Sequence, residues 1–208
     1  SVLAVTGNVL PVTKDDVNLV GVLRDGSRIL GESHIPVAAL ERHSPIDHIE
    51  LLPKDVVPFD RCIAAINDAD IIILGPGSLY TSIIPNLLVD GISFALAASP
   101  AKKVYVCNVM TQPGETDGFS AYDHVAAIEK HMDGNYIDYC IANSGEIPPQ
   151  ALAKYDEQNS VPVRLDKARF DGCRTELIEK NLVFYDKENV IVRHDYVKLA
   201  REILRLCM

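Results

Sequence analysis

Three apolar runs, each followed by a loop of small and polar residues, restrict the folds that this 208-residue chain can adopt. The runs are Asp70–Leu74, Lys103–Val109 and Tyr136–Ala142. The first is continuously apolar from Ile71 onward, which is typical of a strand buried on both faces of a sheet. Strands that alternate with helical stretches at a regular spacing indicate βαβ units. The central part of the chain therefore predicts an α/β fold around a parallel sheet.

The residues before this region have the pattern of a β-hairpin. Val17–Leu23 and Arg28–Gly31 flank a turn signal at Arg24–Ser27. No linker or low-complexity segment divides the chain, so a single domain is predicted over residues 1–208. The other predicted elements are strands at Asn8–Thr13, His48–Leu52, Val161–Leu165 and Val190–Val192, a polar stretch at Glu41–Asp47, and helices at Asp60–Asn67, Ala121–Met132, Gln150–Glu157 and Tyr196–Leu206.

The composition argues against several classes of protein. Hydrophobic residues make up 48% of the chain, more than a disordered chain carries. The net charge of −9 leaves no basic surplus to neutralise phosphates, so neither nucleic acid nor an anionic membrane is expected as a partner. Pro85 and Asp90 interrupt the longest apolar stretch, Ile83–Ala98, so no membrane insertion is expected. The five cysteines form no CxxC pair, and we expect free thiols in a reducing cytoplasm.

In an open parallel sheet, ligands bind at the carboxyl ends of the strands, where loops and helix N-termini converge. The loop after Leu74 offers glycines and hydroxyl residues at a helix start, where free N–H groups attract anions. No Lys follows the glycines, so the loop is not a P-loop. The alternative is a Gly-Pro turn whose hydroxyls only cap the helix. The predicted phosphate-binding residues of this loop are Gly75, Gly77, Ser78, Thr81 and Ser82.

Four residues outside that loop are further candidates. Glu115 and Asp117 could hold Mg²⁺ or work as an acid–base pair, or they could simply cap the next helix. Asn108 is a candidate contact to a base or ribose, and otherwise satisfies local backbone. Arg193 lies between an apolar run and a helix start, where a guanidinium can fork onto a diphosphate or form an exposed salt bridge. No histidines pair at metal-ligand spacing, so a zinc enzyme is not expected.

Two long runs of the sequence resemble the gluconeogenesis factor (YvcK-like) family, which belongs to the CofD-like group named after 2-phospho-L-lactate transferase. The runs are LGPGSLYTSIIPNLLV at Leu74–Val89 and KKVYVCNVMTQPGETDG at Lys102–Gly118. SAYDHV follows the second run, and VRHD at Val192–Asp195 also fits the family. The similarity covers almost the whole chain, more loosely from Gln150 to Asn189.

The resemblance implies a three-layer α/β/α Rossmann-like fold with a mostly parallel sheet, beside the antiparallel hairpin near the N-terminus. It also implies a cytoplasmic bacterial protein that binds a UDP-sugar, is tied to gluconeogenic growth, and affects cell shape and cell-wall synthesis. The nucleotide-sugar site of the family has an aromatic residue and an arginine, which fall here on Tyr155 and Arg193. The alternative is a Mg²⁺-dependent transferase like the CofD relatives, which move 2-phospho-L-lactate from a guanosine diphosphate carrier onto a deazaflavin.

The chain departs from the family pattern in one respect. Family members begin with a strand that leads into a GGGTG-type loop and continue with a DDGGSSG-like segment, and neither occurs in these 208 residues. We therefore expect the chain to be the C-terminal two-thirds of a longer protein, and the loops of this chain to form one wall of a cleft. A third hypothesis is a purely structural protein with well-capped turns, against which the Gly/Ser/Thr loop and Arg193 argue. The identity of the sugar, the presence of a homo-oligomer and any downstream partner stay open.

Overall fold

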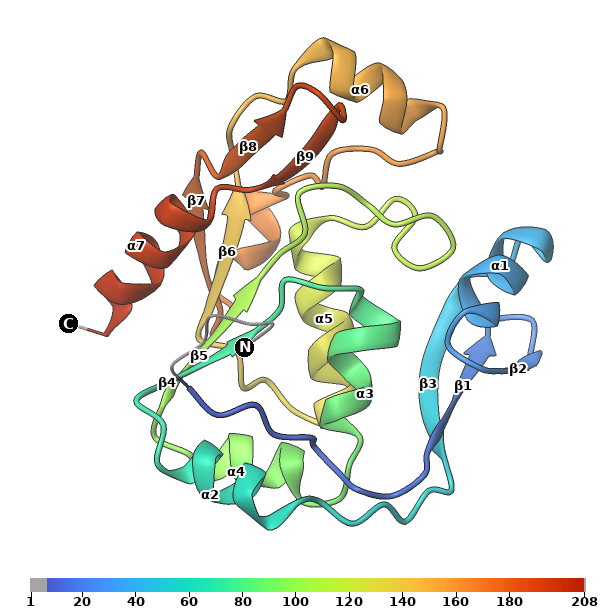
Figure 1. Ribbon diagram of the computed structural model, residues 1–208, viewed down its shortest axis with the longest axis vertical. Coiled ribbons are helices and arrows are strands. Elements are labelled where there is room, and N and C mark those ends of the chain that lie inside the picture. The colour runs from blue at the N-terminus through green and yellow to red at the C-terminus, as the bar shows by residue number, and fades with distance from the viewer. Residues whose placement is uncertain (1–6, 208) are drawn as a thin grey trace.

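The computed structural model describes residues 7–207, and its centre is a parallel four-stranded sheet (Figure 1). The strand order is β4-β5-β6-β7, and each neighbouring pair is parallel. The predicted parallel sheet is therefore confirmed, with one more strand than the three apolar runs suggested. The strands are β4 (Ile71–Leu74), β5 (Lys102–Val106), β6 (Tyr139–Asn143) and β7 (Glu176–Lys180).

Alternate residues of β5 face opposite layers of helices. Tyr105 belongs to a core that includes Val125 and Ile128 of α5 (Ala121–Met132). Val104 and Val106 belong to a second core with Leu199 of α7 (Tyr196–Leu206). The sheet thus lies between helices on both faces, which confirms the three-layer α/β/α prediction.

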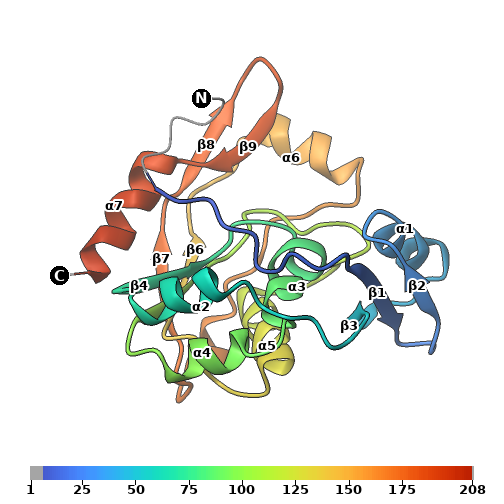
Figure 2. The ribbon, with the colours of Figure 1, turned by 60° about the horizontal axis from the view of Figure 1, so that its bottom comes forward.

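A second, antiparallel sheet has the order β2-β1-β3 and lies to one side of the central sheet (Figure 2). Its strands are β1 (Asn18–Leu23), β2 (Arg28–Leu30) and β3 (Ile46–Leu52), so the predicted hairpin is confirmed. The short helix α1 (His34–Glu41) packs on β1 so closely that a Cβ on Gly21 would lie 2.7 Å from Ile35 Cγ2. The absence of a side chain at Gly21 therefore permits the contact.

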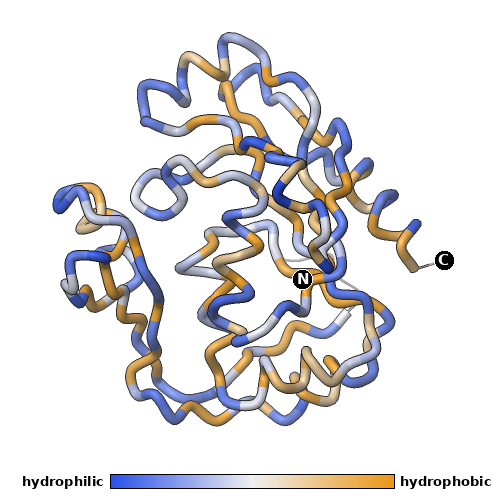
Figure 3. Tube along the Cα trace, turned by 180° about the vertical axis from the view of Figure 1, so that it is seen from behind, coloured by the Kyte–Doolittle hydropathy of each residue, from blue (hydrophilic) through white to orange (hydrophobic). Residues whose placement is uncertain are grey.

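The remaining elements lie around the two ends of the central sheet, with β8 (Val183–Asp186), β9 (Ile191–His194) and α6 (Pro149–Asp156) at its upper end in Figure 1 and α2 (Asp60–Asn67) and α4 (Ile92–Ala98) at its lower end. The two strands β8 and β9 form a short antiparallel pair that leads into α7. Figure 3 shows both hydrophobic and hydrophilic segments along α7, whose apolar side packs on the sheet. The other helical elements are α3 (Ile84–Leu87), a π-helical turn η1 (Leu79–Ile83) and a 3₁₀ turn η2 (Lys167–Phe170).

Several predicted strands differ from the structure. Asn8–Thr13 contains no strand, only an isolated bridge between Thr13 and Pro58. Val161–Leu165 likewise forms only isolated bridges, through Pro162 and Arg164. Both segments contain a proline, which cannot donate to a strand ladder. The sequence pattern did not predict α1, β7 or β8.

Within residues 7–207, no single helix is long and apolar enough to cross a membrane. The combined stretch Leu79–Leu87 and Ile92–Ala98 reaches the required length and composition only as two pieces bent by 76°.

Candidate functional site

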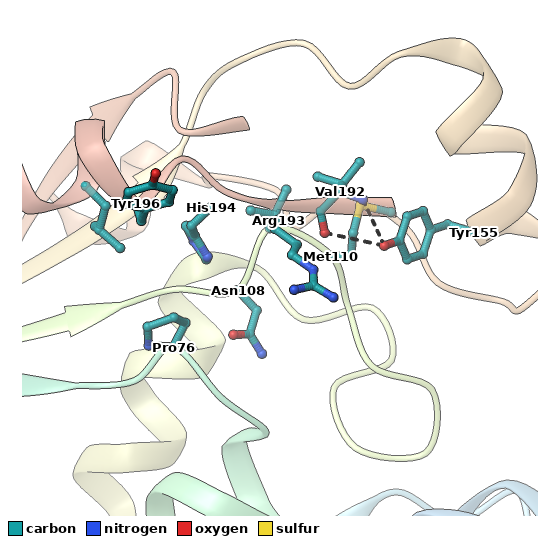
Figure 4. Close-up of a pocket in the computed structure, with 10 residues that line it drawn as sticks. Pro76, Asn108, Met110, Tyr155, Val192, Arg193, His194 and Tyr196 are labelled. Carbon is teal, nitrogen blue, oxygen red and sulfur yellow. Dashed lines mark hydrogen bonds between the residues drawn. The ribbon is translucent and has the colours of Figure 1, made fainter. Parts of the chain in front are cut away.

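A cavity of about 570 Å³ opens where the carboxyl ends of β4 and β5 meet β9 and the start of α7 (Figure 4). Its volume is in the range of small-molecule sites. Four separate segments of the chain line it, as expected for the loop edge of a parallel sheet. The lining residues are Pro76, Asn108, Val109, Met110, Tyr155, Val192, Arg193, His194, Tyr196 and Leu199.

Arg193, which the sequence places between an apolar run and a helix start, is the third residue of β9 and lines this cavity. Its side chain is exposed, and none of the carboxylates in residues 7–207 comes within salt-bridge distance of it. Figure 4 shows the guanidinium directed into the same space as the Asn108 side chain. The cavity therefore presents a cation that forms no salt bridge within the described residues, although Arg193 is near enough to Asp186 to help lower the pKa of that carboxyl, and such a cation suits an anionic ligand.

The N-terminus of α7 contributes little positive potential to the cavity, because Asp195 occupies its free N–H groups. The Asp195 carboxylate caps the helix and accepts hydrogen bonds from Val197 N (3.1 Å) and Lys198 N (3.0 Å). These bonds and the bond to Lys198 lower the pKa of Asp195, so the carboxylate is ionised at neutral pH. A protein anion therefore uses the two N–H groups, and Arg193 is the main cationic feature of the cavity.

Tyr155 reaches the cavity from α6 and holds β9 in place. Its hydroxyl accepts a hydrogen bond from Val192 N at 3.2 Å and lies 3.5 Å from Val192 O. Val192 directly precedes Arg193, so this contact fixes the backbone that carries the guanidinium. Tyr155 and Arg193, the two residues that the family resemblance singled out, thus lie in one cavity.

Asn108 connects the ends of β4 and β5. Its Nδ2 donates a hydrogen bond of 3.0 Å to the carbonyl oxygen of Gly77. In the same loop, Gly75 has φ +83°, and a Cβ there would lie 3.1 Å from Val106 O. The conformation and the crowding both require glycine at position 75. Gly77 has room for a Cβ, whose nearest neighbour would be 3.7 Å away.

The predicted phosphate loop is divided between two places. Gly75, Gly77 and Ser82 line a second cavity of about 380 Å³, which shares Pro76 with the first. Ser78 and Thr81 line neither of these two cavities. Part of the loop therefore lies beside the first cavity, which we call the Arg193 cavity, and not inside it.

Glu115 already occupies the position at this turn where an anion was expected. Its Oε2 accepts from Tyr80 N at 3.0 Å, and its Oε1 accepts from Thr81 Oγ1 at 2.9 Å. Gln112 Nε2 donates to Oε1 as well, also at 2.9 Å. Burial raises the pKa of Glu115 above its usual range, and the hydrogen bonds from Thr81 and Tyr80 offset only part of this rise. The carboxylate fastens the second loop to the first turn of η1.

The two predicted metal candidates do not form a common site. Both oxygens of Glu115 are hydrogen bonded in a buried position, whereas Asp117 Oδ2 accepts from Gly114 N at 2.7 Å on the surface. Within the described residues, no group of three or more His, Cys, Asp or Glu side chains could hold a metal ion. In this arrangement Glu115 and Asp117 do not fit a Mg²⁺ site.

The sequence pattern missed His194 as a residue of the cavity. His194 Nε2 lies 3.1 Å from the carbonyl oxygen of Cys107, and burial lowers the pKa of the imidazole. The signal was its place in VRHD, directly after Arg193. Pro76, Met110 and Tyr196 also line the cavity and were not among the predicted site residues.

Comparison with known proteins adds a family model described as "2-phospho-L-lactate transferase CofD", which matches residues 1–183. A "Putative gluconeogenesis factor" of Clostridium acetobutylicum is 45% identical over 208 residues, which is all of this chain and 46% of that protein. The "Gluconeogenesis factor" of Bacillus subtilis is 42% identical over 205 residues, covering 99% of this chain and 63% of that protein. The chain thus spans between about half and just under two thirds of the length of these relatives.

A solved structure also matches. The crystal structure of a member of the UPF0052 family from Bacillus halodurans is similar with a TM-score of 0.90 at 40% sequence identity. The match covers 98% of this chain and 64% of that one. Almost every described element therefore has a counterpart in that protein.

Proposed function

The chain belongs to the CofD family, in its gluconeogenesis factor (YvcK-like) branch, and on that premise we propose that the Arg193 cavity binds a nucleotide sugar. The role proposed for the protein is that of a cytoplasmic, non-enzymatic regulator of bacterial carbon metabolism, which affects gluconeogenic growth, cell shape and cell-wall synthesis. A UDP-sugar is the proposed ligand. The whole protein's activity belongs to this proposal too, because the chain is shorter than its relatives.

One observation carries the proposal. Arg193, Asn108 and Tyr155 reach a single cavity from β9, the end of β5 and α6. A guanidinium can bind a diphosphate with two parallel hydrogen bonds, an amide can contact a ribose or base, and an aromatic ring can pack on a base or sugar. A nucleotide sugar carries all three kinds of group.

Isothermal titration calorimetry on the full-length protein tests the proposal. UDP-sugars are titrated first, then GDP and flavin-like acceptors under the same conditions. We expect saturable binding of a UDP-sugar and weaker binding of GDP. Absence of UDP-sugar binding, with the protein shown to be folded, would contradict the proposal.

The description of the matching family model favours a second function, transfer of 2-phospho-L-lactate with Mg²⁺. That hypothesis requires Glu115 and Asp117 to come together around Mg²⁺, which they do not do in this arrangement, and under it Glu115→Gln and Asp117→Asn abolish Mg²⁺-dependent turnover while nucleotide affinity stays within a few-fold. Under the regulator hypothesis, the purified wild-type protein shows no turnover, and neither do the two variants. The internal hydrogen bonds of Glu115 support the regulator. Robust transfer by purified protein would overturn it.

A further inference from the structure

His194 has one nitrogen fixed by the protein and one that is free. A carbonyl oxygen can only accept, so the 3.1 Å contact to Cys107 O places the proton on Nε2. The neutral imidazole then has its lone pair on Nδ1. Within residues 7–207, Nδ1 has no hydrogen-bond partner, and it is not among the buried polar atoms that lack one. It is therefore an accessible acceptor in a residue that lines the cavity.

The other polar groups of the cavity have different roles. Arg193 only donates hydrogen bonds, and the Asn108 amide nitrogen is already used on Gly77 O. The Tyr155 hydroxyl is shared with the backbone of Val192. His194 thus adds an imidazole acceptor beside the cation, in addition to Asn108 Oδ1, which also has no hydrogen-bond partner within residues 7–207, and it follows Arg193 directly on β9.

We infer that His194 is a specificity-determining residue, whose Nδ1 accepts a hydrogen bond from an O–H or N–H group of the ligand held by Arg193. The inference rests on the proposed nucleotide-sugar function and assigns a residue to it. The donor is a sugar hydroxyl, of the ribose or of the attached sugar, or the imide N–H of uracil. All of these share the chemistry that a neutral imidazole acceptor recognises.

Two substitutions test the contributions of the two His194 nitrogens separately. His194→Gln places an amide nitrogen near the position of Nε2 and can keep the bond to Cys107 O, but it removes the acceptor at Nδ1. His194→Asn places an amide oxygen near the position of Nδ1 and gives up the bond to Cys107 O. We expect His194→Gln to weaken UDP-sugar binding roughly three- to tenfold, and His194→Asn to recover part of the loss. Melting temperatures confirm that both variants fold.

The pH dependence distinguishes an acceptor from a cation. Protonation puts a hydrogen on Nδ1, so the affinity for a UDP-sugar falls as the pH is lowered from 8 to 5. A histidine that contacted phosphate as a cation would give the opposite slope. The groups around His194 are Arg193 on β9, Asp195 and Lys198 at the start of α7, and the hydroxyls of Tyr155 and Tyr196. Comparison of the wild type with His194→Gln isolates the contribution of His194, since both proteins carry all the other groups.

Titrations at pH 8 locate the donor. If His194→Gln weakens UDP and a UDP-sugar equally, the donor lies on the uridine part, and if only the UDP-sugar is weakened, it lies on the attached sugar. Equal UDP-sugar affinities of wild type and His194→Gln, or stronger binding of the wild type at low pH, would overturn the inference and leave the proposed function standing. Absence of UDP-sugar binding by the wild type would overturn both.

Discussion

Arg193 is exposed and forms no salt bridge with any carboxylate of residues 7–207, so its removal should affect the ligand more than the fold. We expect Arg193→Ala to lower UDP-sugar affinity ten- to a hundredfold, or roughly 1.5 to 3 kcal/mol, because a charge-assisted bidentate contact is lost. Arg193→Lys should recover only part of it, since an ammonium cannot form the planar fork. Calorimetric titration measures both.

Arg201 provides a matched control for this substitution. It is an exposed arginine of α7 that is not a lining residue of the Arg193 cavity. Arg201→Ala removes the same charge from the same part of the molecule and should leave affinity unchanged. Equal affinities of Arg193→Ala and wild type would refute the assignment of Arg193.

The two glycines of the first loop have different requirements. Gly75 has φ +83° and a backbone oxygen 3.1 Å from the place of its missing Cβ, whereas Gly77 has neither constraint. We expect Gly75→Ala to lower the free energy of unfolding by about 1 to 2 kcal/mol or more, and Gly77→Ala to change it much less. Urea denaturation of the two variants measures the difference, provided that the dependence of the free energy of unfolding on urea concentration is the same in both. A larger loss for Gly77→Ala would contradict this account.

The residues of the candidate site were predictable to the extent that their chemistry shows in the residue type. Arg193, Asn108 and Tyr155 lie in one cavity, and the glycine-rich loop begins at the end of β4 as expected. The sequence could not reveal that Glu115, from another loop, satisfies Tyr80 N and Thr81 Oγ1. That contact joins residues distant in the chain, and only the tertiary fold brings them together.

At the scale of elements, a histidine connects α5 to the antiparallel sheet. His131 Nδ1 donates to Ala127 O at 2.7 Å, and its Nε2 accepts from Ile49 N on β3 at 3.1 Å. Burial lowers the pKa of His131, and it also lowers that of His124, whose Nε2 is buried without a partner. Both rings therefore stay neutral in the folded protein where an unfolded histidine would take up a proton.

The free energy of unfolding should consequently fall as the pH drops below about 6.5, the value for an unfolded histidine, because only the unfolded chain then binds the protons readily. Above that pH the rings are neutral in both states and the effect disappears. His131→Gln keeps an acceptor for Ile49 N and cannot titrate, so it should reduce the loss between pH 7 and pH 5. Exposed His34 is the control: His34→Gln should show the same change of the free energy of unfolding with pH as the wild type. Identical slopes for all three proteins would count against this role of His131.

The elements that the sequence predicted best are those whose apolar pattern matches their burial. β5 and β6 are apolar runs within the central sheet, and α5 and α7 have apolar faces that pack on it. β4 is as apolar as expected, but it forms an edge of the sheet and Ile73 is exposed, so the prediction that this strand is buried on both faces was wrong. β7 was missed because it reads ELIEK, with charged residues at both ends, and it pairs only with β6 at the edge of the sheet. α1 was missed because it buries only Ile35 and Ala39, too few apolar positions to mark a helix.

At the scale of the whole molecule, ligand binding should protect segments that are remote in the sequence. The cavity joins Pro76, Asn108 to Met110, Tyr155 and Val192 to Tyr196. We expect a saturating UDP-sugar to slow backbone hydrogen exchange in all four segments together, and to leave β1 and β2 unchanged. Exchange followed by mass spectrometry measures this. Protection confined to the loop after β4 would place the ligand in the neighbouring cavity instead.

The distance along the chain between the walls of the cavity also has a consequence for synthesis. A ribosome makes the chain from its N-terminus, and domains begin to fold as they emerge. β4 and β5 can pair early, but Arg193 and His194 leave the ribosome after all the other lining segments, long after Asn108 and also after Tyr155. A nascent chain therefore has no complete cavity until its last described helix is being made. On the proposed function, truncated products that end before Arg193 would lose nucleotide-sugar binding.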